Sequence, residues 1–142
     1  MMAGKFGLSK TRQYAILSGI KQRCYNTRNR HYGSYGAKGI TVCDEWLGEA
    51  GAWNFYKWSI THGYNDNLTI DRIDSSEGYS PENCVWMEPE INSMRSVPGI
   101  KLLTVIRKCP TYEDEFLKRQ IAKVSDPELR GILKARYKEV RG

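Results

Sequence analysis

The stretch from Leu68 to Arg95 constrains the fold more than any other part of the sequence, because 28 residues hold the signals of four elements. The segment LTIDRI at 68–73 predicts a strand, and CVWM at 84–87 predicts a second short strand. The segment between them, DSSEGYSPEN, is rich in residues that form turns. Pro89 suits the first turn of a helix, which we expect to run to about Arg95. Two strands and a helix this close in sequence predict one small α+β unit.

The sequence predicts further elements on both sides of this unit. Residues 9–24 predict an amphipathic helix that Ser9 caps. The residues at helical spacing on its apolar face are Tyr14, Leu17, Ile20 and Cys24. Residues 40–43 predict a short strand, and residues 45–58 predict an aromatic helix that Gly63 ends. After Val97-Pro98-Gly99, two helical patterns at 112–124 and 127–140 predict a hairpin.

Charge is divided unevenly along the chain, whose formal net charge is +6. Residues 1–43 carry eight basic and no acidic residues, residues 44–96 carry three basic and ten acidic ones, and residues 97–142 carry eleven basic and six acidic ones. Such basic ends suit a polyanion such as double-stranded DNA, and the four tyrosines of the first segment add groups that stack on bases. The basic residues that we expect to contact DNA are Lys21, Arg23, Arg28, Arg30, Lys38 and Arg95. The alternative is a solvated surface with an uneven charge.

The chain has no apolar run approaching 18 residues and no apolar start typical of a signal peptide, so we expect a cytoplasmic protein without a membrane span. Of its four cysteines, none forms a CxxC pair. Cys24, Cys43 and Cys84 are therefore either reduced core thiols or, together with His31, ligands of a zinc ion.

The segment around Asp71 carries the chemistry. The sequence reads Thr-Ile-Asp-Arg-Ile-Asp at 69–74, continues to Asn83 and Trp86, and reaches Asn92 nine residues after Asn83. This register resembles the HNH, or His-Me finger, endonucleases, and it is closest to those of phages. The resemblance implies a ββα-metal finger that acts on DNA in the cytoplasm of a bacterial host. It also implies that Asp71 and Asn92 bind Mg²⁺ or Mn²⁺, while Asn83 bonds within the loop and orients the catalytic base.

One position departs from this family. Arg72 stands where the family has its catalytic histidine, and a guanidinium cannot take a proton from water at any working pH. Arg72 could instead hold the scissile phosphate by two parallel hydrogen bonds. Three consequences stay open: a binder that does not cut, a substitute base such as His62 or Tyr79, or slow hydrolysis by metal-bound water. A purely structural alternative has Arg72 paired with Asp74 or Glu82.

The resemblance extends upstream through RCYN at 23–26, YGAKGITVC at 35–43 and Trp46. Phage proteins with this Asp-Arg-Ile-Asp variant are sometimes labelled as related to the plant AP2/ERF DNA-binding domain. The sequence thus predicts a basic helix and loop arm (1–43), an aromatic helix with the finger (44–96) and a helical C-terminal extension (97–142). That extension could mediate a homodimer or hold a protein partner.

Three functions compete at this stage. The first is a metal-dependent DNA endonuclease or nickase, with Asp71, Arg72, Asn83 and His62 as its catalytic candidates. The second is a DNA-binding regulator on the same scaffold that does not cut. The third is a phage accessory protein that binds and inhibits a host defence complex, its acidic middle segment imitating nucleic acid.

Overall fold

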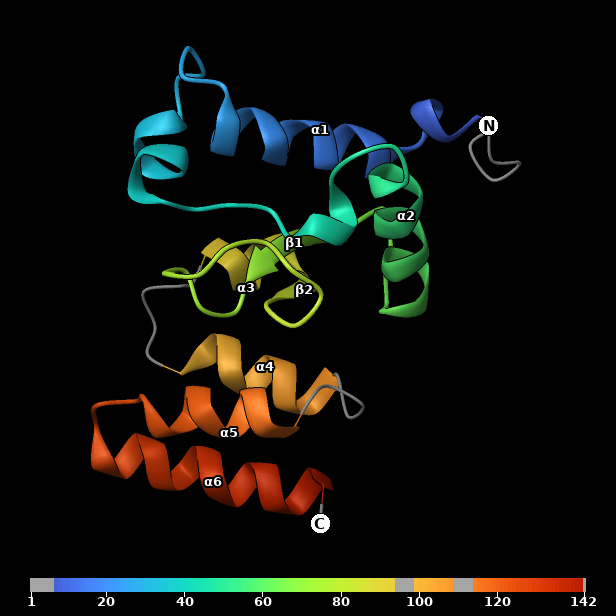
Figure 1. Cartoon of the computed structure of the whole chain (residues 1–142). Helices are drawn as coiled ribbons and strands as arrows, with labels where there is room; N and C mark the ends of the chain where they lie inside the picture. The colour runs from blue at the N-terminus through green and yellow to red at the C-terminus, as the bar shows by residue number, and fades with distance from the viewer. Residues whose placement is uncertain (1–6, 94–98, 109–113, 142) are drawn as a thin grey trace.

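A computed structural model describes residues 7–93, 99–108 and 114–141 and places a two-stranded sheet between two groups of helices (Figure 1). Strands β1 (Thr69–Arg72) and β2 (Cys84–Met87) are antiparallel, with Asp71 opposite Val85. The short helix α3 (Pro89–Ser93) follows β2. The predicted α+β class and the predicted order of strand, loop, strand and helix are confirmed.

Strand β2 is buried along its whole length. Cys84 and Trp86 pack into a core beneath α1 (Arg12–Tyr25) and α2 (Gly51–Thr61). Val85 and Met87 belong to a second core, formed with α4 (Ile100–Lys108) and α5 (Asp114–Ala122). Because successive side chains of a strand point to opposite faces, four residues join the two cores.

Helix α1 begins later than the sequence predicts. Thr11, not Ser9, caps it, and the Thr11 hydroxyl accepts a hydrogen bond from the Tyr14 amide at 3.2 Å. Gln13, Leu17, Ile20 and Cys24 form the buried face, while Tyr14 is 40% exposed. The predicted apolar face was therefore wrong at its first position. Leu17, Ile20 and Cys24 are buried as predicted, but the residue that precedes them on this face is Gln13 and not Tyr14.

The aromatic segment splits into two elements. Asp44–Trp46 is a single 3₁₀ turn, and α2 begins only at Gly51, six residues after the predicted start. A Cβ at Gly51 would lie 2.4 Å from the Trp46 carbonyl oxygen, so the turn must pack directly on the helix start. Trp46, Phe55 and Trp58 form the buried aromatic core, and Gly63 follows the helix with φ at +83°.

The strand predicted at 40–43 does not form. Val42 makes one isolated parallel bridge with Tyr79, in which the Cys43 amide donates to the Tyr79 carbonyl and the Tyr79 amide donates to the Thr41 carbonyl, both at 2.8 Å. The partner is the loop after β1, which turns away after one residue, so no ladder can extend.

The described part of the C-terminal extension holds three helices, because α4 precedes the predicted pair α5 and α6 (Pro127–Arg141). Sequence reasoning missed α4, whose β-branched residues Thr104, Val105 and Ile106 suit a strand equally well. All three helices stack below the sheet in Figure 1. None of the helices within the described ranges is both long enough and apolar enough to span a membrane.

We expect Gly78→Ala to destabilise the fold by about 1–3 kcal/mol, the usual range for overpacking. A Cβ at this position would lie 2.4 Å from the Thr41 carbonyl oxygen, where the loop after β1 meets residues 41–43. Urea denaturation monitored by tryptophan fluorescence measures the effect.

Gly131→Ala is the matched control. Gly131 is an exposed residue of α6, and a Cβ there meets nothing within 4 Å. The same substitution should therefore stabilise the protein by about 0.5–1 kcal/mol. Equal effects at the two glycines would contradict the close approach of the loop to Thr41.

Candidate functional site

A polar cavity of about 230 Å³ opens beside the end of β1. Its lining comes from α1, the segment around Tyr35, β1, the loop after β1 and α4. The charged and aromatic residues among them are Arg23, Tyr35, Asp71, Arg72, Tyr79 and Lys101. Three cations thus share the cavity with one carboxylate.

The carboxylate of Asp71 is paired with Lys101, the second residue of α4. The Lys101 ammonium nitrogen lies 3.3 Å from Oδ2 and 3.4 Å from Oδ1 of Asp71, and it donates to the Arg72 carbonyl oxygen at 2.8 Å. Both side chains are largely buried, at 19% exposure for Lys101 and 12% for Asp71. Lys101 therefore neutralises the only acidic side chain among the described residues of the cavity lining.

Arg72 ends β1 and turns its guanidinium into the following loop. Nη1 donates to the carbonyl oxygens of Ser75 and Glu77, both at 2.9 Å. The guanidinium carbon also lies 5.2 Å from the ring centroid of Tyr35 and 5.0 Å from that of Tyr79. These contacts use one of the three guanidinium nitrogens, and the ion pair with Asp74 or Glu82 considered from sequence is not formed.

Arg23 of α1 joins the same cluster. Its guanidinium carbon lies 5.1 Å from the Tyr35 ring centroid, and Nη2 donates to the Tyr79 hydroxyl at 3.4 Å. The Nε atom is buried without a hydrogen-bond partner among the described residues. Burial raises the pKa of Tyr79, and the neighbouring Arg23 offsets this only in part, so the phenol is protonated at neutral pH.

The loop from 74 to 83 is fastened by Asn83, whose side chain is buried. Its amide nitrogen donates to the carbonyl oxygens of Asp74 and Gly78 at 3.0 and 2.8 Å. Its amide oxygen accepts from the Asp74 backbone N–H at 2.8 Å. This pattern fixes the direction in which the chain leaves β1, and with it the positions of Arg72 and Tyr79.

The side chain of Asp74 also joins this loop to the C-terminal end of α5 and the residue that follows it. One carboxylate oxygen accepts from the Ser76 hydroxyl and amide at 2.6 and 3.0 Å, and the other accepts from Lys123 and Gln120 at 3.0 and 3.3 Å. Burial by itself would raise the pKa of Asp74, but the hydrogen bonds from Ser76 and Lys123 outweigh it and hold this pKa well below its usual range.

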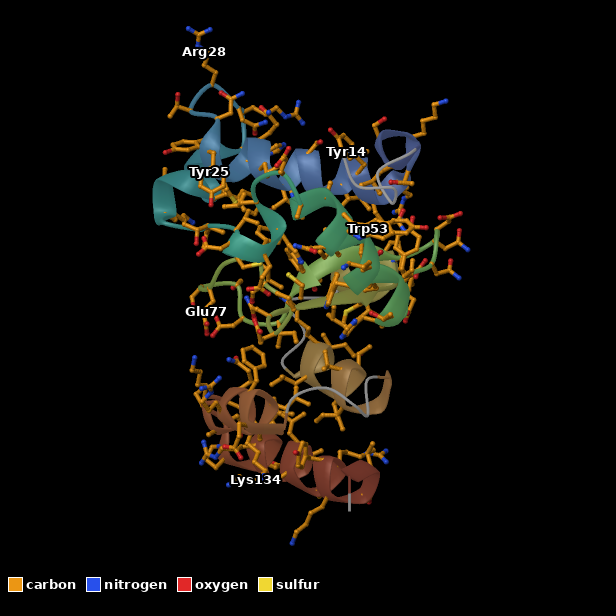
Figure 2. All side chains as sticks on the ribbon, turned by 45° about the vertical axis from the view of Figure 1, so that its right-hand side comes forward. Tyr14, Tyr25, Arg28, Trp53, Glu77 and Lys134 are labelled. Atoms are coloured by element: carbon orange, nitrogen blue, oxygen red, sulfur yellow. The ribbon has the colours of Figure 1, made fainter. Side chains whose placement is uncertain are left out.

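The other residues predicted from the sequence lie outside this cavity. His62 ends α2, with its ring on Trp58 and Nδ1 2.8 Å from the Trp58 carbonyl oxygen, and it is not among the described residues of the cavity lining. Arg28, Arg30 and Lys38 are exposed on the arm, where Figure 2 shows Arg28 projecting from the tip, and Lys21 is half-buried. Arg95 and the side chain of Asn92 lie outside the described residues.

The three cysteines gather in the upper core, with Cys24 and Cys84 buried and Cys43 packed against them. Burial raises the pKa of each thiol, to about 11 for Cys43, so these groups are protonated at neutral pH. His31 is exposed and accepts a hydrogen bond from Arg30. Two of the three thiols thus belong to the core, and the third packs against its edge.

Only one of the two ligands expected for Mg²⁺ or Mn²⁺ lies among the described residues, because the side chain of Asn92 falls outside them. Asp71, the carboxylate assigned to the metal, is already paired with Lys101, and Asp74 is saturated by its own donors. Within the described ranges, no group of three or more His, Cys, Asp or Glu side chains is placed to hold a metal ion.

Sequence reasoning missed Tyr35 and Lys101 as members of the site. Tyr35 stood out only as one of several tyrosines in the arm, and Lys101 lies 30 residues from Asp71 in a segment without a recognised element.

No protein-family model matches this chain, and comparisons with curated proteins and with solved structures find no similar protein. The function must therefore be inferred from the chemistry of the cavity and of the surface around it.

We expect Arg72→Gln to loosen the loop, because two carbonyl oxygens lose a cationic donor. The cost should be about 1–3 kcal/mol in the free energy of unfolding, and amides 74–83 should exchange faster with deuterated solvent.

Arg12→Gln is a matched control for this change. Arg12 also donates to a carbonyl oxygen, that of Leu68 at 2.7 Å, and also lies over a tyrosine ring, that of Tyr64. The Arg12→Gln variant should leave the amide hydrogen exchange of residues 74–83 unchanged. Faster exchange there in both variants would mean that Arg72 does not fasten the loop specifically.

Asp74→Asn should reduce the acid sensitivity of the protein. Because the folded-state pKa of Asp74 is depressed, its stabilisation is fully present above its unfolded-state pKa of about 4 and is lost as the pH falls toward the folded-state value. Wild type should therefore lose more stability than Asp74→Asn between about pH 5 and pH 2 in urea titrations.

The comparison variant is Glu77→Gln, which alters the weaker contact of Lys123 with Glu77 at 3.8 Å. Glu77 is half-exposed, so this change should cost less than about 1 kcal/mol. If wild type and Asp74→Asn lost stability in parallel through the acid range, the stabilisation by the Asp74 contacts would not depend on the ionised carboxylate.

Proposed function

We propose that this chain binds double-stranded DNA through the phosphate backbone, on an HNH-like ββα scaffold, without cleaving it. The observation that carries the proposal is the composition of the cavity beside β1, where three cations share the lining with one carboxylate that a lysine already neutralises. The cavity therefore has an excess of positive charge, and an anion such as a phosphodiester is the ligand that balances it.

The hydrogen-bond donors of Arg72 and Arg23 favour a phosphate as the bound anion. Arg72 keeps Nε and Nη2 without an acceptor among the described residues, and Arg23 keeps a buried Nε in the same state. A buried donor without a partner is costly, and a phosphate oxygen would remove that cost. Guanidinium groups also match the planar pairs of oxygens that a phosphodiester presents.

Further cations lie on the arm. Arg28 projects from its tip (Figure 2), five residues after Arg23, and Arg30 is also exposed. Tyr25, which is 47% exposed, is held in place because its hydroxyl accepts a hydrogen bond from the Val42 amide at 2.9 Å. A duplex needs several phosphate contacts along its length, and the arm supplies cations beyond the one cavity.

The groups near the proposed phosphate position support binding without cleavage. Arg72 cannot act as a general base, and the raised pKa of Tyr79 keeps its phenol protonated. His62 is held against Trp58, away from the cavity lining, and Asp71 is engaged by Lys101. The described lining thus offers no free group to activate a water molecule.

A protein-binding function is the second candidate, and one observation favours it. Ile132 and Val140 of α6 are 48% and 42% exposed, and both line an apolar cavity between α4 and α6. Exposed apolar side chains beside such a cavity suit a protein partner of the C-terminal helices.

Fluorescence anisotropy with a labelled DNA duplex tests the proposal. Wild type should bind with an affinity that falls steeply with salt, because bound cations release counterions from the phosphates. Arg23→Gln and Arg28→Gln should each weaken binding on all sequences alike and reduce the salt slope by about 1.

Lys57→Gln is the control, since Lys57 is an exposed cation of α2 in the acidic part of the sequence. It should leave both affinity and slope unchanged. A parallel plasmid assay with Mg²⁺ or Mn²⁺ should show no nicking. Nicking that disappears in Asp71→Ala would establish the endonuclease instead, and absence of DNA binding would favour the protein-binding candidate.

A further inference from the structure

The ammonium group of Lys101 lies in a cradle of oxygen atoms. Its nitrogen is 3.3 and 3.4 Å from the two carboxylate oxygens of Asp71 and 2.8 Å from the backbone carbonyl oxygen of Arg72. A carboxylate together with a backbone carbonyl is a donor set typical of hard divalent cations. A lysine side chain thus occupies the place that such a cation would need.

The position of Lys101 is set by the fold. Lys101 belongs to the first turn of α4, which begins at Ile100. Gly99 directly precedes this helix, and its φ of +77° allows the chain to turn into it. Val105 of the same helix is fully buried against the core that holds Val85 and Met87 of β2. Because α4 is anchored beneath the sheet, its second residue is held at the end of β1.

The carboxylate has little else to bind. Oδ2 of Asp71 is buried and has no hydrogen bond among the described residues, although the ammonium nitrogen lies 3.3 Å away. A bare carboxylate beside a phosphate would repel it, and this repulsion is screened little where both charges are buried. Some cation must therefore accompany Asp71 if the cavity is to hold an anion.

We propose that Lys101 is this cation, a built-in replacement for a divalent metal ion between Asp71 and the bound phosphate. The cavity then binds a phosphodiester without metal, and removal of the lysine side chain opens an oxygen cradle that takes a divalent cation. The identity of the anion rests on the proposed DNA binding, whereas the cation site can be measured without DNA.

Titration of the full chain with Mn²⁺, followed by the loss of the free-ion electron paramagnetic resonance signal, tests the cation site. Wild type and Asp71→Asn should bind Mn²⁺ equally weakly. Lys101→Ala should gain one site at least about tenfold tighter, and the double variant with Asp71→Asn should lose it again. Lys101→Arg, which keeps a cation, should behave as wild type does.

Two outcomes would overturn the proposal. One is Asp71-dependent Mn²⁺ binding by wild type, since the metal would then not be replaced by lysine. The other is failure of Lys101→Ala to gain a site while its circular dichroism spectrum and melting temperature show that it is folded. If that variant does not fold, Mn²⁺ binding by wild type that is lost in Asp71→Asn would still overturn the proposal.

Duplex binding in EDTA separates this inference from the proposed function. Wild-type affinity should be the same in EDTA and in Mn²⁺, while Lys101→Ala should bind at least about tenfold more weakly in EDTA and recover in Mn²⁺. Wild-type binding that requires Mn²⁺ would overturn the metal-free site. Absence of duplex binding under every condition would refute the proposed function, and the Mn²⁺ titration would still decide the role of Lys101.

Discussion

The burial of β2 on both faces is the constraint on which the rest of the structure depends. A two-stranded sheet alone in water is marginal at best, because one hairpin covers too little apolar surface. Here Cys84 and Trp86 pack under the N-terminal helices, while Val85 and Met87 pack on the C-terminal ones. The C-terminal helices also share a small core of their own around Ile106, Ile121 and Leu133, but β2 is the element that contributes to both of the cores on either side of the sheet.

The position of β2 also fixes the cavity. β1 is held by its pairing with β2, and Asn83, directly before β2, bonds through its side chain to the start and the middle of the loop that connects them. This loop carries Tyr79 against residues 41–43 and gives Arg72 two carbonyl acceptors. The side chains of the cavity are therefore oriented before any ligand arrives, which lowers the entropic cost of binding.

The proposed replacement of a metal ion by a lysine rests on the charges in the cavity. Asp71 is too buried to remain without a counter-charge, and the ammonium of Lys101 supplies one from α4. Arg72 and Arg23 then add positive charge that no described acidic residue of the lining balances. In the nuclease family that the sequence resembles, a metal ion and a histidine are expected at the positions where this chain has a lysine and an arginine. Both changes favour holding a phosphate over activating water.

Local patterns in the sequence determined the elements that depend on local physics. The second strand at 84–87, the turn-rich loop, the helix start at Pro89 and the stop at Gly63 follow from alternation, turn chemistry and backbone freedom, and each is where the sequence predicts it. The register of Asp71 and Asn83 also marked the end of the first strand and its loop as the site. Local expectations were wrong for the strand at 40–43, the start of α2, and the cap and first buried position of α1, and α4 was missed altogether.

Only the tertiary structure decided what the site is made of. Lys101 meets Asp71 across 30 residues, and Arg23 meets Tyr79 across 56, because the two cores bring α4 and α1 to the same end of β1. No periodicity or motif encodes such contacts, since they depend on how whole helices pack and not on neighbouring residues. The sequence by itself therefore placed the carboxylate and the arginine, and the fold alone determined that a lysine neutralises the first and two tyrosines flank the second.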